Sequence, residues 1–378
     1  MAGQTDAAVA IDRVPLLDMS RQYAVLKDQL DSAVLKVMAH GWFIMGPEMK
    51  QFETEVAEFV GAKHAIGVAS GTDALLLALR AAGVGPGDEV ILPAFSFFAT
   101  AGVVSRLGAT PKFIDIDPET YNVDPALIEA AIGPNTKAVM PVHLFGQCAD
   151  MNPIVDIAKA KGLAVVEDAA QALSSSYKGT RAGALGDLGC FSFYPTKNLG
   201  AMGDGGMITT DSDELATELL RLRVHGAKPK YYNQTVGYNS RLDTLQAAVL
   251  SVKLPHLEAW SESRREHAAY YDKGLAGLPV EVPVVRDYGV HIYNQYTIAL
   301  DRRDDFREHL KSRNIGHEIY YPVPLHLQEC YNGLGYKQGD LPVSERAAAR
   351  VCSLPIFPEL TFDEQDFVVK AIADFVGA

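Results

Sequence analysis

The sequence is poor in cysteine and contains no closely spaced cysteine pair. Four cysteines occur among 378 residues, at positions that lie far apart: Cys148, Cys190, Cys330 and Cys352. A disulfide framework requires more cysteines, and a zinc site requires ligand pairs at short spacing. We therefore expect reduced, mostly buried thiols, no metal site and a cytoplasmic location.

Long apolar runs and basic blocks are also missing. Charge or glycine interrupts every apolar stretch well before the ~20 residues that a membrane span requires. The polar first twelve residues lack the basic and apolar regions of a signal peptide. Lysine and arginine number 34 against 47 aspartates and glutamates, which gives a net charge of −13. Membranes and nucleic acids are therefore not expected as partners, although a local basic pocket for an anionic ligand remains compatible with this charge.

Several nucleotide- and metal-binding signatures are absent as well. The sequence has no P-loop, HExxH or EF-hand pattern. Residues 83–88 (Gly-Val-Gly-Pro-Gly-Asp) are the best candidate for a nicotinamide-cofactor turn. They lack the GxGxxG spacing and follow a predicted helix rather than a strand, so they are more typical of a helix end. An NAD-dependent oxidoreductase is therefore the weaker alternative.

The residues that are present describe an α/β enzyme. Apolar residues make up 48% of the chain and charged residues 21%, as in globular enzymes. Ser20 can cap a first helix that runs to His40, and Pro47 opens a second. From residue 64 onward, short apolar runs alternate with helical patterns, which predicts a mostly parallel sheet covered on both faces. The expected strands are residues 64–69, 89–92, 111–115, 137–142 and 163–167.

The pattern changes after residue 184. Residues 188–194 and 206–210 are predicted to form two strands around a glycine-rich turn. A long helical region, residues 242–275, contains Pro255, which should kink or divide it. We predict a large α/β domain over residues 1–254, including the N-terminal helical segment, and a small C-terminal α+β domain over residues 255–378.

Two segments can bind charged groups at strand ends. In Ser70–Leu75 (SGTDAL) glycine turns the chain from a strand into a helix, so free backbone N–H groups and the Thr72 hydroxyl can bind an anion. An ordinary helix cap explains the same residues. Glu167 and Asp168 follow an apolar strand, where an acid can bind a ribose hydroxyl, a metal or a protonated ring nitrogen. A helix cap is again the alternative.

A third segment distinguishes between these readings. Lys197 follows an aromatic strand and precedes a glycine-rich turn, within residues 190–206. Most lysines are solvated surface charges, but apolar and aromatic flanks would desolvate this amine and lower its pKa, which suits a Schiff-base nucleophile. Ser192 supplies another phosphate donor. A phosphate cradle, an acid and a desolvated lysine together indicate pyridoxal 5′-phosphate chemistry.

The chain resembles the DegT/DnrJ/EryC1/StrS family of pyridoxal-phosphate-dependent nucleotide-sugar aminotransferases. The resemblance extends over nearly the whole chain, and its most specific segments are Gly46–Glu48, Ser70–Leu75, Gly87–Val90, Glu167–Gln171, Ser192–Gly206, Asn239–Asp243 and Gln246–Ala248. It implies the aspartate-aminotransferase-type fold (fold type I) and a homodimer with active sites shared between subunits. Sugar dehydratases of the family carry histidine instead of the lysine, so Lys197 favours transamination. A non-catalytic regulator would be expected to lose Lys197 or Asp168.

The resemblance also implies roles for individual residues. Lys197 would bind the cofactor covalently and move the substrate proton, and Asp168 would hold the proton of the pyridinium ring. Further cofactor contacts would come from the residues for the phosphate, the ring oxygen and the ring face: Gly71, Thr72, Ser192, Gln171 and Phe97, with Phe95 as a substitute for Phe97. Asn239 would reach the phosphate in the neighbouring subunit. The expected substrate contacts are Arg241, Tyr321 and His326.

The same resemblance suggests the reaction. L-glutamate would donate the amino group, and a nucleotide-linked keto-sugar would accept it. The segments 291–297, 194–197 and 239–248 are most similar to enzymes that act at the C-3 position of UDP-linked 3-keto-N-acetylglucosamine derivatives, including the uronic acid. Arg241 would then contact the C-6 carboxylate. The alternatives are a dTDP-linked 3-keto-6-deoxyhexose and a C-4 keto-sugar.

Overall fold

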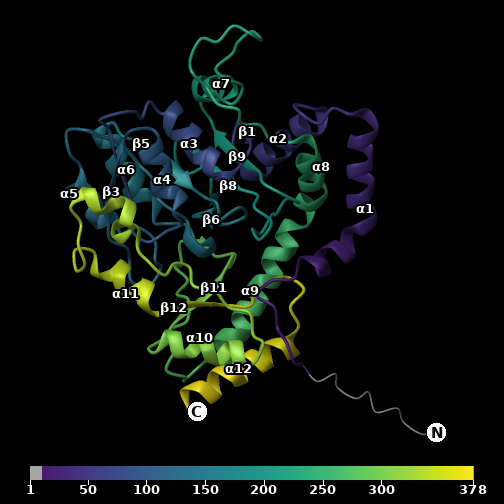
Figure 1. Cartoon of the computed structure of the whole chain (residues 1–378), viewed down its shortest axis with the longest axis vertical. Coiled ribbons are helices and arrows are strands. Elements are labelled where there is room, and N and C mark those ends of the chain that lie inside the picture. The colour runs from purple at the N-terminus through teal and green to yellow at the C-terminus, as the bar shows by residue number, and fades with distance from the viewer. Residues whose placement is uncertain (1–10, 378) are drawn as a thin grey trace.

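The computed structural model describes residues 11–377 (Figure 1). Residues 1–10 lie outside this range, so the prediction about a signal peptide stays a prediction from the sequence. Figure 1 shows a sheet flanked by helices and, below it in this view, a C-terminal part that α9 (Leu257–Gly274) connects to it. None of the helices described here is long and apolar enough to cross a membrane.

A seven-stranded sheet forms the centre of the fold. Its strand order is β1-β9-β8-β5-β4-β2-β3. β9 runs antiparallel to both of its neighbours, and the other pairings are parallel. The strands are β1 (His64–Val68), β2 (Glu89–Pro93), β3 (Thr110–Ile114), β4 (Thr136–Val139), β5 (Ala164–Asp168), β8 (Leu188–Ser192) and β9 (Gly206–Thr210). This confirms the predicted mostly parallel sheet.

Helices cover both faces of the sheet, because successive strand residues point to opposite sides. Val165 of β5 packs into one apolar core and Val166 into the other. The core with Val165 includes three helices: α2 (Pro47–Val60), α6 (Met151–Lys161) and α8 (Thr244–Lys253). The core with Val166 includes three more: α3 (Gly71–Ala81), α4 (Ala99–Arg106) and α7 (Asp213–Leu222). Each large buried side chain contributes roughly 1.5–3 kcal/mol, so these two cores dominate the stability of the sheet.

The long helical region is divided at Pro255, as the sequence predicts. α8 ends at Lys253, one 3-10 turn follows, and α9 begins at Leu257. Proline has no N–H to donate to the preceding turn, so an α-helix cannot continue through it undisturbed. α9 therefore leaves the sheet and enters the C-terminal part.

The first helix, α1 (Met19–His40), has a different cap from the predicted one. The carboxylate of Asp18 accepts a hydrogen bond from the Ser20 N–H at 3.0 Å, so Asp18 rather than Ser20 is the N-cap. The carboxylate competes better than the hydroxyl because it also complements the positive end of the helix. Gly41 ends the helix with φ 74°, a left-handed conformation that glycine adopts without strain.

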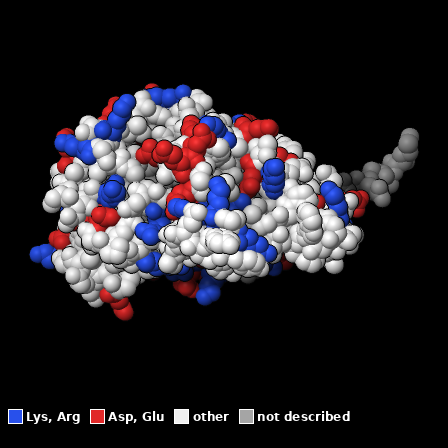
Figure 2. Space-filling view, turned by 90° about the horizontal axis from the view of Figure 1, so that it is seen from above, with Lys and Arg blue, Asp and Glu red and all other residues white. Residues whose placement is uncertain are grey.

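The C-terminal part has its own apolar core, to which the start of the described chain contributes. Val14 packs there and pairs with Ile315 as an isolated parallel bridge. The main elements of this part are α9, α10 (Arg303–Ser312), α12 (Phe362–Val376), β11 (Tyr296–Ala299) and β12 (Val351–Leu354). The α-helices and strands of the whole fold that have not yet been named are α5 (Ile128–Ala131), α11 (Pro342–Arg350), β6 (Ser176–Tyr177), β7 (Thr180–Arg181) and β10 (Gly289–Val290). On the face seen in Figure 2, acidic and basic side chains are interspersed.

Candidate active site

A cavity of about 600 Å³ lies where the carboxyl ends of the parallel strands meet. Open α/β sheets bind their ligands at this edge, because several strand ends and helix starts converge there. The cavity brings together most of the predicted site residues: Gly71, Thr72, Phe97, Asp168, Gln171, Ser192, Lys197 and Tyr321. These residues come from distant parts of the sequence, so the fold itself assembles them.

One end of the cavity is a tight anion cradle. The Ser70 hydroxyl caps α3 by accepting a hydrogen bond from the Asp73 N–H at 3.1 Å, and α3 therefore points its first N–H groups at the cavity. A Cβ on Gly71 would lie 2.6 Å from the Cβ of Ser192, a distance that only glycine permits. The Ser192 side chain thus lies directly against the helix start, where hydroxyl and backbone donors can share one anion.

Asp168 is a buried acid whose carboxylate is held in one orientation. It lies at the end of β5 and is 5% exposed. Thr100 donates its hydroxyl to Oδ2 at 2.8 Å, and the Ala170 N–H donates to Oδ1 at 3.3 Å. Burial raises the pKa of Asp168, while these hydrogen bonds and the Lys197 ammonium oppose that rise. The carboxylate is therefore positioned to accept a proton from a ligand in the cavity.

Thr100 is a contact that the sequence analysis missed. It is fully buried in the first turn of α4, and its hydroxyl also lies 2.8 Å from that of Ser96. The Ser96 hydroxyl thus lies against the Thr100 hydroxyl, which in turn donates to Asp168. The sequence signal was weak, because α4 is short and rich in small residues and was not predicted as a helix.

Lys197 carries an amine that is partly neutral near physiological pH. Burial lowers its pKa to about 8, although the Asp168 carboxylate acts in the opposite direction. The loop that carries it is closely packed, since a Cβ on Gly200 would lie 2.2 Å from the Pro195 carbonyl oxygen. The lowered pKa that the sequence predicts for this amine is therefore present in the structure.

Aromatic and amide groups also line the cavity. Gln171 accepts a hydrogen bond from the Phe145 N–H at 2.7 Å and donates one to the Tyr321 hydroxyl at 3.2 Å. Phe97 lies 6.0 Å from Tyr321 between ring centroids and is 55% exposed, so its face is free to stack on a ring. Phe95 is fully buried in a core cluster, which leaves Phe97 as the aromatic residue at the cavity.

Three predicted residues lie outside this cavity. Asn239 and Arg241 line a second hollow of about 580 Å³, which shares Ser70 and Asp204 with the first. His326 is 1% exposed and its Nε2 lies 3.1 Å from a carboxylate oxygen of Glu345. The fold therefore places Asn239 and Arg241 beside the cavity, whereas His326 is buried next to Glu345 and does not line it.

Glu167, the acid next to Asp168, has a structural role. It is fully buried and points away from the cavity, where it accepts hydrogen bonds from the N–H groups of Gly183, Leu185 and Gly186 at 2.7 to 2.8 Å. His143 accepts a hydrogen bond at Nδ1, so its Nε2 donates to Glu167 at 2.9 Å. Four donors thus satisfy this carboxylate, and of the two acids Asp168 alone faces the cavity.

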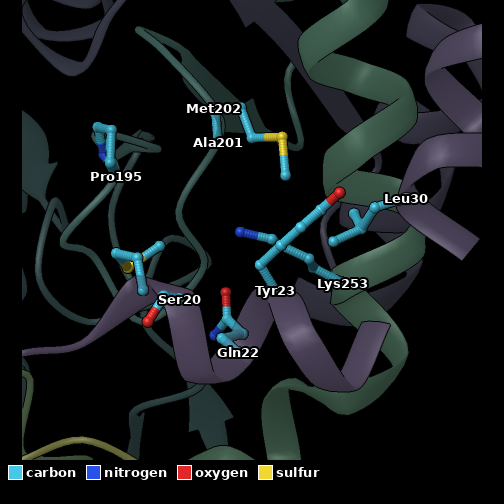
Figure 3. Close-up of a pocket in the computed structure, with 9 residues that line it drawn as sticks. Ser20, Gln22, Tyr23, Leu30, Pro195, Ala201, Met202 and Lys253 are labelled. Atoms are coloured by element: carbon cyan, nitrogen blue, oxygen red, sulfur yellow. The ribbon is translucent and has the colours of Figure 1, made fainter. Parts of the chain in front are cut away.

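A second buried lysine, Lys253, lies in a separate hollow of about 320 Å³ next to α1 (Figure 3). It is 2% exposed and donates to the Gly200 carbonyl oxygen at 2.8 Å. Burial lowers its pKa to about 8 as well, opposed by the charge of Glu359. Figure 3 shows its amine turned toward the chain between Pro195 and Ala201. The sequence analysis did not single out this lysine.

Comparison with known proteins adds names to this geometry. Residues 25–373 match the DegT/DnrJ/EryC1/StrS aminotransferase family. A pleiotropic regulatory protein of Geobacillus stearothermophilus is 53% identical over 96% of this chain and 98% of that protein. A UDP-N-acetyl-3-dehydro-alpha-D-glucosamine 3-aminotransferase of Acidithiobacillus ferrooxidans is 46% identical over 92% of this chain and 94% of that protein. A UDP-2-acetamido-2-deoxy-3-oxo-D-glucuronate aminotransferase of Pseudomonas aeruginosa is 45% identical over 92% and 96%.

Solved structures share the same fold. The X-ray structure of S. venezuelae DesV in complex with a ketimine intermediate has a TM-score of 0.95 at 44% identity, and the match covers 97% of this chain and 99% of that one. The structure of ntda from Bacillus subtilis, with bound cofactor PMP, has a TM-score of 0.91 at 32% identity and covers 98% and 87%. The similarity therefore extends over both the sheet and the C-terminal part.

Proposed function

This chain belongs to the DegT/DnrJ/EryC1/StrS aminotransferase family, and we propose that it uses pyridoxal 5′-phosphate to move an amino group from L-glutamate to C-3 of a UDP-linked 3-keto-N-acetylglucosamine derivative. The observation that carries this proposal is one cavity with an anion cradle, an oriented acid and an amine of lowered pKa: Gly71 with Ser192, Asp168 and Lys197.

The donor set of the cavity fits the cofactor. Gly71, Thr72 and Ser192 would hold its phosphate at the start of α3, where a Cβ on Gly71 would close the cradle. Asp168 would hold the proton of the ring nitrogen, and the exposed face of Phe97 would stack on the ring. The bound cofactor supplies an electron sink that stabilises negative charge on the substrate carbon.

Within this frame, the side chains of the chain perform the proton transfers. Lys197, as a neutral amine, would take the proton from the reacting carbon of the donor and pass it to the bound cofactor, and in the second half-reaction it would carry a proton in the opposite direction, to the carbon of the keto-sugar. A pKa of about 8 leaves a useful fraction of neutral base near pH 7.5 and a conjugate acid that can give the proton back. Asp168 would lie opposite the ammonium or the protonated ring nitrogen, and the Thr100 hydroxyl fixes the orientation of its carboxyl group.

The proposed sugar and the proposed position of amination rest on the names of two relatives and on the location of Arg241. Two relatives at 45–46% identity are named as aminotransferases of 3-keto UDP-sugars, one of them a uronate. Arg241 is a cation in the hollow next to the cavity, where it could bind a C-6 carboxylate in a bidentate manner. UDP-2-acetamido-2-deoxy-3-oxo-D-glucuronate is therefore the first substrate to test.

A homodimer with shared sites is part of the proposal. Trp42, Phe43 and Ile44 are 66%, 46% and 48% exposed, an unusual run of large apolar side chains on a surface. The run lies next to the hollow with Asn239, because the Phe43 carbonyl oxygen accepts a hydrogen bond from the Thr244 N–H at 2.9 Å. A second subunit placed there would cover the apolar run. Asn239 would then reach the phosphate of the cofactor that the second subunit binds.

The alternative of a non-catalytic regulator is supported by the name of a relative, since the chain is 53% identical to a protein named as a regulator. A regulator needs neither a basic amine nor an acid inside a cavity. This chain keeps both Lys197 and Asp168, with the amine at a lowered pKa. Catalysis is therefore the better-supported function.

An absorption spectrum tests the proposal directly. The purified protein, supplied with pyridoxal phosphate, should show a visible band that L-glutamate bleaches. A UDP-linked 3-keto sugar should restore the band, and a dTDP-linked 3-keto-6-deoxyhexose should do so less well. A protein that stays colourless with the cofactor contradicts the proposal. If the dTDP-linked sugar restores the band better than the UDP-linked sugar does, the dTDP-linked sugar is the substrate.

A further inference from the structure

The wall of the Lys197 cavity offers little positive charge to an acidic amino donor. Among its described lining residues, Lys197 is the only cationic side chain, and Asp168 and Asp204 are acids. L-glutamate carries two carboxylates, and its amine has to react near Lys197. At least one carboxylate therefore requires a cation from outside this lining.

A small cavity of about 50 Å³ adjoins the main one. Thr196, Gln295 and Tyr320 line both cavities, so the two share a wall next to Lys197. Arg264 of α9 and Asn294 line the small cavity. They are 3% and 6% exposed, so these polar side chains are largely removed from bulk solvent.

Arg264 is a buried cation without an acidic partner. Its Nη1 donates to the carbonyl oxygens of Tyr293 at 3.0 Å and Ile356 at 2.9 Å, and more weakly to Asn294 at 3.4 Å. Its Nε has no hydrogen-bond partner, and within residues 11–377 the guanidinium forms no ion pair. Burial lowers the pKa of Arg264 to about 10, and the more distant charge of Glu359 opposes this shift only in part.

The neighbouring amides are also unsatisfied. Both Nδ2 and Oδ1 of Asn294, and Oε1 of Gln295, have no hydrogen-bond partner among the described residues. Buried polar atoms in folded proteins nearly always have partners, so several orphans around one cavity indicate a ligand or ordered water. The free donors here are the guanidinium and an amide N–H₂, which together suit a carboxylate.

We propose that Arg264 and Asn294 form the subsite for one carboxylate of the dicarboxylate amino donor. A cavity of about 50 Å³ admits a carboxylate but not a whole amino acid, because one water molecule already occupies ~30 Å³ of liquid volume. The remainder of the donor would stay in the main cavity, with its amine toward Lys197. Because the donor is taken from the proposed function, this subsite depends on that function.

Asn294→Asp is the variant that tests the subsite. The new carboxylate has the same shape, lies beside Arg264 and repels the carboxylate of the donor. It also gives the guanidinium an ionic partner, so the fold should be retained, whereas removal of Arg264 would leave three carbonyl oxygens without their donor. We expect the KM for L-glutamate in the bleaching half-reaction to rise at least tenfold, and restoration of the band by the keto-sugar to change less than twofold.

Binding without chemistry provides an independent measurement. Glutarate has both carboxylates but no amine, and its Kd can be determined by calorimetry. Asn294→Asp should weaken glutarate binding at least tenfold, and Asn135→Asp, the same change at an exposed turn that lines neither cavity, should leave it within twofold. Unchanged glutamate KM and glutarate Kd in Asn294→Asp would show that the small cavity holds only water. Failure of glutamate to bleach the wild-type protein would instead refute the proposed donor.

Discussion

Lys197 and Lys253 are two buried lysines of one chain, and burial lowers the pKa of each to about 8. Their surroundings differ. Lys197 faces a cavity of about 600 Å³ together with Asp168, at the edge of the sheet where the strands end. Lys253 donates to the Gly200 carbonyl oxygen inside a mostly apolar hollow next to α1 (Figure 3).

The comparison separates two properties that are often treated as one. A lowered pKa reports only that an amine is desolvated, and both lysines satisfy this condition. Catalysis also requires space for a substrate and an acid that acts on the same ligand, and these are present only around Lys197 among the residues described. The two lysines are nevertheless connected, because Lys253 supports the loop that carries Lys197 by holding Gly200.

The largest expected effect distinguishes the two amines by activity. Lys197→Ala should reduce turnover by roughly 10⁴-fold or more, because both the covalent attachment and the proton transfer are lost. Lys253→Ala should retain activity within about tenfold, since its amine contacts only the loop. Turnover and the visible band of both variants, with thermal unfolding as a control for folding, decide the matter. Comparable losses in the two variants would mean that Lys253 takes part in catalysis.

The next prediction concerns Asp168, because no acid among the described residues lines the hollow that holds Lys253. Asp168→Asn removes the charge that holds the ring proton, and turnover should fall by roughly 10²- to 10³-fold. Glu167→Gln is the matched change at the adjacent acid, which faces away from the cavity. It should destabilise the protein more than it alters the visible band. Spectra and denaturation curves of both variants test this assignment, and a normal rate in Asp168→Asn would contradict it.

A third prediction uses stability to compare the lysines. The pKa of Lys253 is about 8 in the folded protein and 10.5 for an ordinary lysine, so between these values the unfolded chain binds a proton that the folded chain does not. Stability due to this group should therefore rise with pH from about 8 to 10.5. Lys253→Met should remove about 2 kcal/mol of that rise. Denaturant unfolding of both proteins at pH 8 and pH 10 measures the difference. If the free energy of unfolding changes equally with pH in the two proteins, Lys253 has an ordinary pKa.

The smallest predicted effect comes from Thr100. Thr100→Val keeps the shape but removes the hydroxyl that donates to Asp168. The pKa of Asp168 should rise, because that hydrogen bond lowers it, and turnover should fall by about tenfold, equivalent to ~1.4 kcal/mol. Thr100→Ser retains the hydroxyl and should recover most of the activity. If Ser and Val behave alike, shape rather than hydrogen bonding explains the role of Thr100.

The sequence predicted the sheet and most of the site, and its failures have physical causes. Strand–helix alternation and Pro255 are local signals, so the parallel sheet and the divided helix were predictable. α4 was missed because Ala99–Arg106 has a weak apolar period and contains Gly102. Lys253 was missed because a lysine in the last turn of a helix resembles a solvated C-terminal charge. Its burial depends on packing against α1, which begins more than 200 residues earlier.

His326 is a second residue whose surroundings could not be inferred from the sequence pattern. Its segment follows Tyr321, which does line the cavity, so proximity in sequence suggested a shared site. The chain turns inward at the short 3-10 helix Leu325–Leu327, and the imidazole ends beside Glu345. Whether His326 contributes to substrate binding stays a prediction. Side-chain direction over five residues of irregular chain cannot be inferred from the pattern alone.

The pairing of Val14 with Ile315 has a consequence for how the protein is made. The Val14 N–H donates to the Asn314 carbonyl oxygen at 3.1 Å, and the Gly316 N–H donates to Val14 at 2.7 Å. A ribosome that adds 5–20 residues per second needs about 15 to 60 s to reach the partner of Val14 after synthesising it. Val14 must stay unpaired during that time, and the C-terminal core can close only after residues 314–316 have emerged from the ribosome.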